Sequence, residues 1–96
     1  MITSKQRAYL RSLSTSLDTI FQIGKSGITE EICQQLANAL EARELIKARV
    51  LENSGYTAKE AANTVAEAIG CEVVCCVGSK FVLYKESTKK KRIELI

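Results

Sequence analysis

The chain has 96 residues, of which 46% are hydrophobic and 26% are charged, and its formal net charge is +3. This composition is typical of one globular domain and excludes a disordered chain. No run of residues is long and apolar enough to span a membrane. Basic residues interrupt the apolar positions from Lys5 onward, which excludes a secretory leader, so we expect a cytoplasmic protein.

The first predicted elements are a helix over residues 4–16 and a strand over residues 19–23. Thr3 or Ser4 can cap the helix, and leucines recur along one of its faces. The strand sequence, TIFQI, is short and rich in β-branched and aromatic residues, which favours extended structure.

Residues 24–27, GKSG, connect this strand to a second predicted helix. Thr29 can cap that helix, and apolar residues at helical spacing continue to about residue 42. The next segment, ELIKARVLE, predicts a strand in which Lys47 and Arg49 point away from the core face, because side chains alternate along a strand.

A third helix and two strands complete the predicted domain. Thr57 and Glu60 form a capping box that begins the helix, and Gly70 ends it. CEVVCCV and KFVLYKE flank Gly78 and Ser79, a connection so short that it predicts a hairpin. The order α-β-α-β-α-β-β predicts an α/β fold, a two-layer sandwich with a four-stranded mixed sheet. In that sheet, helix-linked strands are parallel and the last pair is antiparallel.

The last ten residues, STKKKRIELI, are the only segment of biased composition in the chain. We therefore expect a domain over residues 1–86 and a basic C-terminal tail over residues 87–96. The run KKKR is typical of nonspecific attraction to phosphate, although whether it contacts RNA is left open. Ile93 and Leu95 alternate in this tail and are expected to dock it on the domain.

The cysteines predict neither a disulfide framework nor a metal site. Cys33, Cys71, Cys75 and Cys76 are expected to be free thiols, and the chain has no histidine and no C-x-x-C pair with which to hold zinc. Cys75 and Cys76 lie in an apolar run, so we expect both to behave as small core residues. No cofactor is expected.

The GKSG segment combines several features of an anion site. Its glycines permit close backbone approach and positive φ, and it lies between the end of a strand and the start of a helix, where free N–H groups favour an anion. Lys25 adds a mobile charge and Ser26 a hydroxyl. A nucleotide P-loop is excluded, because Thr19 stands where its first glycine is required. Taken alone, the segment is equally consistent with a plain turn and a solvated lysine.

Four segments carry a family resemblance: SKQRAYLRSL, IFQIGKSGITEEI, ALEARELIKARVLE and VGSKFVLYKES. Through them the chain resembles the CRM domain, the RNA-binding module named for chloroplast RNA splicing and ribosome maturation, and most closely the stand-alone bacterial YhbY-type members. The resemblance covers nearly the whole chain. It implies RNA binding without catalysis and, in bacteria, association with precursors of the large (50S) ribosomal subunit. The family's G-x-x-G loop, its RNA contact, falls on Gly24, Lys25, Ser26 and Gly27.

A basic surface around this loop completes the expected RNA site. The chain has only five aromatic residues, so we expect contacts to the backbone and shape of structured RNA rather than stacked bases. Each cation has a second explanation, either solubility or the protection of a strand edge. The candidate cations beyond the loop are Lys5, Arg7, Arg11, Lys47, Arg49, Lys80 and Lys85.

We expect a monomeric, non-enzymatic protein that takes RNA as its partner and binds neither a membrane nor a small-molecule substrate. An enzyme is disfavoured, because no nucleophile with its base can be named in a chain without histidine. The alternative is a protein-interaction adaptor on ribosomal particles that does not touch RNA. That alternative predicts an exposed apolar patch on a helix and no salt-dependent RNA binding.

Overall fold

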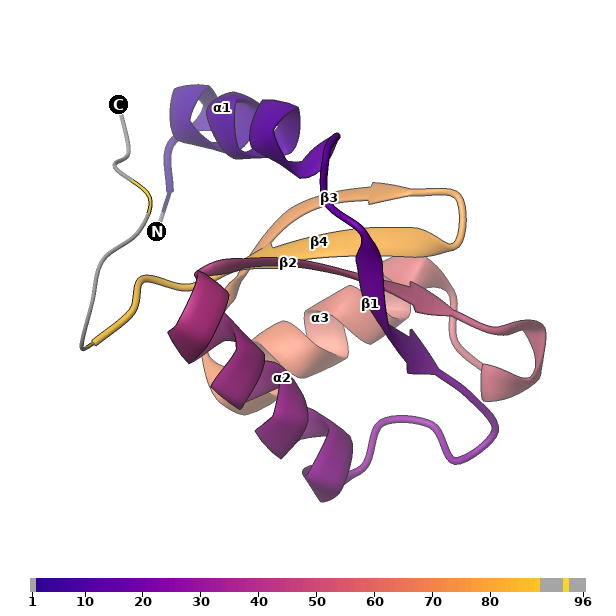
Figure 1. Cartoon of the computed structure of the whole chain (residues 1–96). Coiled ribbons are helices and arrows are strands. Elements are labelled where there is room, and N and C mark those ends of the chain that lie inside the picture. Colours follow the sequence, from indigo (N-terminus) through magenta and orange to yellow (C-terminus); the bar gives the residue numbers. More distant parts are fainter. Residues whose placement is uncertain (1, 89–92, 94–96) are drawn as a thin grey trace.

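The computed structural model describes residues 2–88 and residue 93 as one mixed sheet with three α-helices. One four-stranded sheet has the order β1-β2-β4-β3 (Figure 1). β1 is parallel to β2, and β4 is antiparallel to both β2 and β3, so the predicted α/β fold is confirmed. The elements are α1 (Ser4–Ser14), β1 (Thr19–Ile23), α2 (Glu30–Arg43), β2 (Leu45–Val50), the 3-10 helix η1 (Glu52–Ser54), α3 (Ala58–Ile69), β3 (Glu72–Val77) and β4 (Lys80–Tyr84).

Helices lie on both faces of the sheet. α2 and α3 cover one face, where Ile46 and Ala48 of β2 belong to the larger core. α1 lies on the other face over a smaller core that includes Leu10, Leu45 and Tyr84 (Figure 1). The predicted sandwich is therefore present, and α1 adds a partial third layer because its leucine stripe needs an apolar surface to pack on.

The helix boundaries follow from local capping. The side chain of Thr3 accepts from the N–H of Gln6, and the side chain of Thr57 accepts from that of Glu60, so α1 and α3 both begin with a capping box. The N–H of Thr57 donates to Glu60 at 3.0 Å, and this bond holds the pKa of Glu60 below its usual value. α3 ends at Gly70, whose φ is 71°. None of the described helices combines the length and the hydrophobicity needed to cross a membrane.

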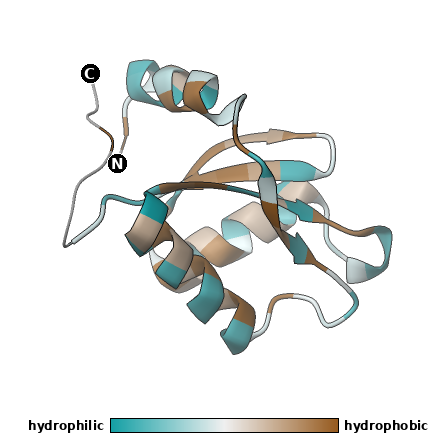
Figure 2. Cartoon of the chain, in the orientation of Figure 1, coloured by the Kyte–Doolittle hydropathy of each residue, from teal (hydrophilic) through white to brown (hydrophobic). Residues whose placement is uncertain are grey.

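Hydrophobic residues concentrate in the middle of the sheet. β3 and β4 are mostly hydrophobic, whereas hydrophobic and hydrophilic residues alternate along α1 and α2 (Figure 2). A register shift lies between Val73 and Cys75 of β3, and both Val74 and Cys75 contribute to the core beneath α1. Cys76 is exposed, so the prediction that it lies in the core is wrong for this residue. Cys71 is buried, and desolvation raises its pKa to about 11.

The residues that follow β4 contact the domain. The N–H of Ser87 donates to the carboxylate of Glu44 at 2.7 Å, and the N–H of Ile93 donates to the other oxygen at 2.6 Å. Thr88 donates to Glu41 through its N–H and its hydroxyl. Ile93 also packs on the core beneath α1, as predicted. The residues 89–92 and Leu95, on which the sequence makes further predictions, lie outside the described part of the chain.

Candidate nucleic-acid interface

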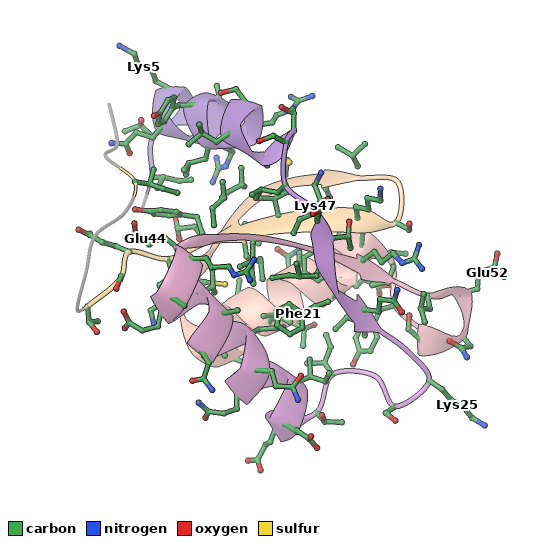
Figure 3. All side chains as sticks on the ribbon, in the orientation of Figure 1. Lys5, Phe21, Lys25, Glu44, Lys47 and Glu52 are labelled. Atoms are coloured by element: carbon green, nitrogen blue, oxygen red, sulfur yellow. The ribbon has the colours of Figure 1, made fainter. Side chains whose placement is uncertain are left out.

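Residues 24–27, here named the GKSG turn, form a tight turn between β1 and α2. The N–H of Gly27 donates to the carbonyl of Gly24 at 2.9 Å, and Gly27 has a φ of 71°. Only glycine adopts this conformation without strain. Lys25 and Ser26 at the centre of the turn are exposed, and the Lys25 side chain extends into solvent (Figure 3).

The turn differs in one respect from the anion site that the sequence predicts. Ile28 and Thr29 separate it from α2, and Thr29 caps the helix by accepting from a backbone N–H of the first turn. Glu30 and Glu31 follow in that first turn. Because these carboxylates already complement the helix dipole, the charge of Lys25 contributes more to anion attraction here than the helix N-terminus does.

The turn is packed against the connection between β2 and α3, here named the bracing segment (residues 51–57). The N–H of Leu51 donates to the carbonyl of Ile23 at 2.9 Å. A Cβ added to Gly24 would lie 3.7 Å from Cδ1 of Leu51, and one added to Gly27 would lie 3.3 Å from Cε2 of Tyr56. Sequence reasoning missed the proximity of both side chains to the turn, since no pattern or motif links Leu51 or Tyr56 to residues 24–27.

Several predicted cations meet on the sheet face that carries α1. Arg11 of α1, Lys47 of β2 and Lys80 of β4 line a groove of about 340 Å³, here named the basic groove. Arg49 pairs with Lys80 in the ladder and lies two residues beyond Lys47, so it projects from the same face. Its Nε is buried and has no hydrogen-bond partner among the described residues. The remaining lining residues are Ser14, Thr15, Cys75, Val77 and Val82.

The GKSG turn and Lys80, at one end of the basic groove, lie at the same end of the sheet. The N–H of Val50 donates to the carbonyl of Ser79 at 2.8 Å, directly before Lys80. β1 also ends here, because Ile23 pairs with Val50. The turn therefore follows β1 at the end of the sheet where Lys80 begins β4.

The sequence and the fold of this chain have counterparts among known proteins. The model of the CRS1/YhbY (CRM) domain family matches residues 2–85. The chain belongs to this family. The Bacillus subtilis protein named "Probable RNA-binding protein YqeI" is 43% identical over 95 residues, which cover 99% of each chain. A Haemophilus influenzae protein named "RNA-binding protein" is 29% identical over 90 residues, which cover 94% of this chain and 91% of that protein.

A solved structure supports the architecture of the CRM domain. The solution structure of a hypothetical protein from Staphylococcus aureus, described as an RNA-binding candidate, superposes with a TM-score of 0.82. That chain is 50% identical, and the superposition covers 100% of both chains. The overall fold of this chain is therefore that of a relative with which it shares half of its sequence.

Three predicted cations of this CRM domain lie away from the GKSG turn. Lys5 projects from the opposite end of the molecule to Lys25 (Figure 3). The Nε of Arg7 donates to the carbonyl of Val73 at 3.3 Å, on the edge strand β3. The Nζ of Lys85 donates to the carbonyl of Ile69 at 3.4 Å, beyond the far end of β4. The structure therefore brings Arg49 and Lys80 to the turn's end of the sheet, joins Arg11 and Lys47 to Lys80 in the basic groove, and leaves these three cations elsewhere.

The aromatic side chains of the CRM domain are not gathered on the basic face. Phe21 and Phe81 belong to the core beneath α2 and α3, and Tyr56 supports the GKSG turn. Tyr84 is 3% exposed in the core beneath α1, and burial raises its pKa. The strands of the basic face thus offer cations without exposed rings on which bases could stack.

Proposed function

We propose that this CRM domain binds structured RNA through the GKSG turn and the basic groove beside it. The observation that carries this proposal is the position of Lys25 and Ser26, exposed on a turn that a second segment holds in place. Arg49 and Lys80 at the same end of the sheet extend the positive surface. The relatives named as RNA-binding proteins support the same assignment.

Contacts to phosphate account best for these residue types. Lysine is a mobile point charge, and the arginines can donate two parallel hydrogen bonds to phosphate oxygens. With no ring exposed on these strands, the groove suits the sugar–phosphate backbone and the shape of folded RNA. Binding should weaken steeply with salt, because each neutralised phosphate releases condensed counterions. Lys5, Arg7 and Lys85 would be reached only by an RNA long enough to pass around the domain.

We propose that the protein acts during assembly of the large ribosomal subunit. The family resemblance supports this proposal, because it implies that stand-alone bacterial members associate with 50S precursors. The role is one of binding, without catalysis and without a cofactor. It would be carried out by a monomer in the cytoplasm, where ribosomal subunits are assembled.

The proposal is tested by measuring binding to a folded fragment of large-subunit ribosomal RNA by fluorescence anisotropy across a salt series. We expect tight binding at low salt that declines linearly in a double-logarithmic plot. Cosedimentation of tagged protein with 50S precursors from lysate provides the cellular arm. Cosedimentation without RNA binding at low salt would contradict the RNA proposal and favour the adaptor alternative.

A further inference from the structure

Three polar side chains lie side by side across the sheet, directly before the GKSG turn. Gln22 of β1 pairs with Arg49 of β2, and Arg49 pairs with Lys80 of β4. Paired residues on neighbouring strands project from the same face, so these three side chains, here named the polar row, are neighbours. Ile23 and Val50, the next residues along β1 and β2, belong to the core beneath α2 and α3. The polar row therefore lies on the opposite face.

The polar row connects the two parts of the proposed RNA site. Gln22 lies two residues before Gly24, the first residue of the turn, and Lys80 at the other end lines the basic groove. Neighbouring strands lie about 4.8 Å apart, so the row spans roughly 10 Å over three strands. On β3 the residue opposite Lys80 is Val77, and the series of polar side chains ends there.

Arg49, at the middle of the polar row, carries a donor that no group in the described part of the chain accepts. Its Nε is buried and has no hydrogen-bond partner there. Buried donors are paired in nearly all folded proteins, because an unpaired donor loses its hydration without compensation. The Arg49 side chain as a whole is only partly buried, and its neighbours Gln22 and Lys80 are exposed. A phosphate suits this guanidinium, since Nε and a terminal nitrogen can donate in parallel to two oxygens.

We infer that the RNA backbone runs from the GKSG turn across the strands along the polar row, where Arg49 holds a phosphate through two parallel hydrogen bonds and Gln22 donates its side-chain amide to the same stretch of backbone. This inference rests on the proposed function, and it adds Gln22 to the site. A neutral amide does not attract phosphate over a distance, so Gln22 affects binding only if the backbone touches it. Lys80 then contacts the backbone where the basic groove begins.

The inference is tested with substitutions that leave the charge unchanged, by fluorescence anisotropy with a short folded RNA across a salt series. Arg49→Lys keeps the positive charge and removes the parallel pair of donors. We expect the affinity to fall about tenfold, the loss of one hydrogen bond to a charged group, while the salt slope stays unchanged. The matched control is Arg43→Lys, the same change at an exposed position in α2, which should leave the affinity unchanged.

The second substitution is Gln22→Ala, which removes an exposed neutral side chain. We expect it to weaken binding about threefold at an unchanged salt slope, the loss of one hydrogen bond from a neutral donor. Gln35→Ala removes the same exposed side chain from α2, on the opposite face of the sheet, and should bind like wild type.

The outcomes separate the polar row from the RNA site as a whole. Losses in both row variants at an unchanged slope, with both controls like wild type, support the inference. Wild-type affinity in either row variant, with binding still weakened by Lys25→Ala, would overturn the row and leave the RNA site intact. Failure of wild type to bind at low salt would overturn the proposed function, and the inference with it. Thermal unfolding identifies a variant that does not fold, and if Arg49→Lys is one, Gln22→Ala alone decides.

Discussion

Two glycine turns with neighbouring lysines lie at the same end of the sheet, and they differ in what supports them. Gly27 has a φ of 71° and Gly78 a φ of 61°, with Lys25 and Lys80 close by. A Cβ added to Gly27 would meet Tyr56 at 3.3 Å, whereas one added to Gly78 would meet nothing within 4 Å. Both sequences contain the glycine and the lysine of a turn. Only the turn at Gly27 also packs against a second segment, and this packing is what we expect to hold the turn in one conformation.

The largest expected effect comes from replacing the two glycines. Gly27→Ala should lower the free energy of unfolding by about 2–3 kcal/mol, because it adds contact with Tyr56 to the strain of positive φ. Gly78→Ala should cost about 1 kcal/mol, since only the strain applies. Urea denaturation of both variants measures the difference. Equal losses would mean that the contact with Tyr56 does not distinguish the turns.

Removing the aromatic ring should be the next largest change. Tyr56→Ala is expected to cost about 2 kcal/mol, less than a fully buried aromatic, because Tyr56 is half-buried. Hydrogen exchange should accelerate in residues 24–27 and stay unchanged in the hairpin at Gly78, as measured by mass spectrometry. Acceleration at both turns would indicate general destabilisation rather than the loss of a local support.

The cap at the end of the bracing segment should have a smaller effect. Thr57→Ala removes the acceptor of the Glu60 N–H and should cost about 1 kcal/mol. Thr57→Ser keeps that acceptor and serves as the control. If both variants unfold at the same urea concentration as wild type, the side chain of Thr57 does not contribute to stability through the capping box.

The smallest expected effect is a pH dependence at the same cap. The bond from Thr57 lowers the pKa of Glu60, so the stabilisation is fully present above the usual value of 4.5 and is lost as the pH falls through the lower, folded-state value. The stability difference between wild type and Glu60→Gln should therefore shrink between neutral pH and about pH 3. If the stability difference stays constant with pH, the charge of Glu60 does not contribute to the stability of the cap.

Local signals in the sequence were sufficient to predict most of the elements. TIFQI formed β1 at its predicted bounds, Thr29 capped α2, and the capping box of Thr57 and Glu60 began α3. These features depend on residues close together in the chain, where propensity and capping chemistry act. The alternation of Lys47 and Arg49 with core residues was visible for the same reason.

Features that depend on distant contacts could not be predicted. A leucine stripe shows that α1 packs on something, but it does not show which face of the sheet that is. The register shift in β3 breaks the period of two, so the exposure of Cys76 did not follow from its apolar surroundings. The contact between Tyr56 and Gly27 joins two loops with no shared pattern. The turn could therefore be found from the sequence, but its support could not.

The measurement that tests the central claim most directly is the salt dependence of RNA binding for wild type, Lys25→Ala and Lys5→Ala. Lys5 provides the control, because it carries the same charge at the opposite end of the molecule. With a short folded RNA, Lys25→Ala should weaken binding and reduce the salt slope by roughly 0.7–0.9, the loss of one phosphate contact, while Lys5→Ala should leave the slope unchanged. Equal slopes for wild type and Lys25→Ala would contradict the assignment of the GKSG turn as the RNA contact.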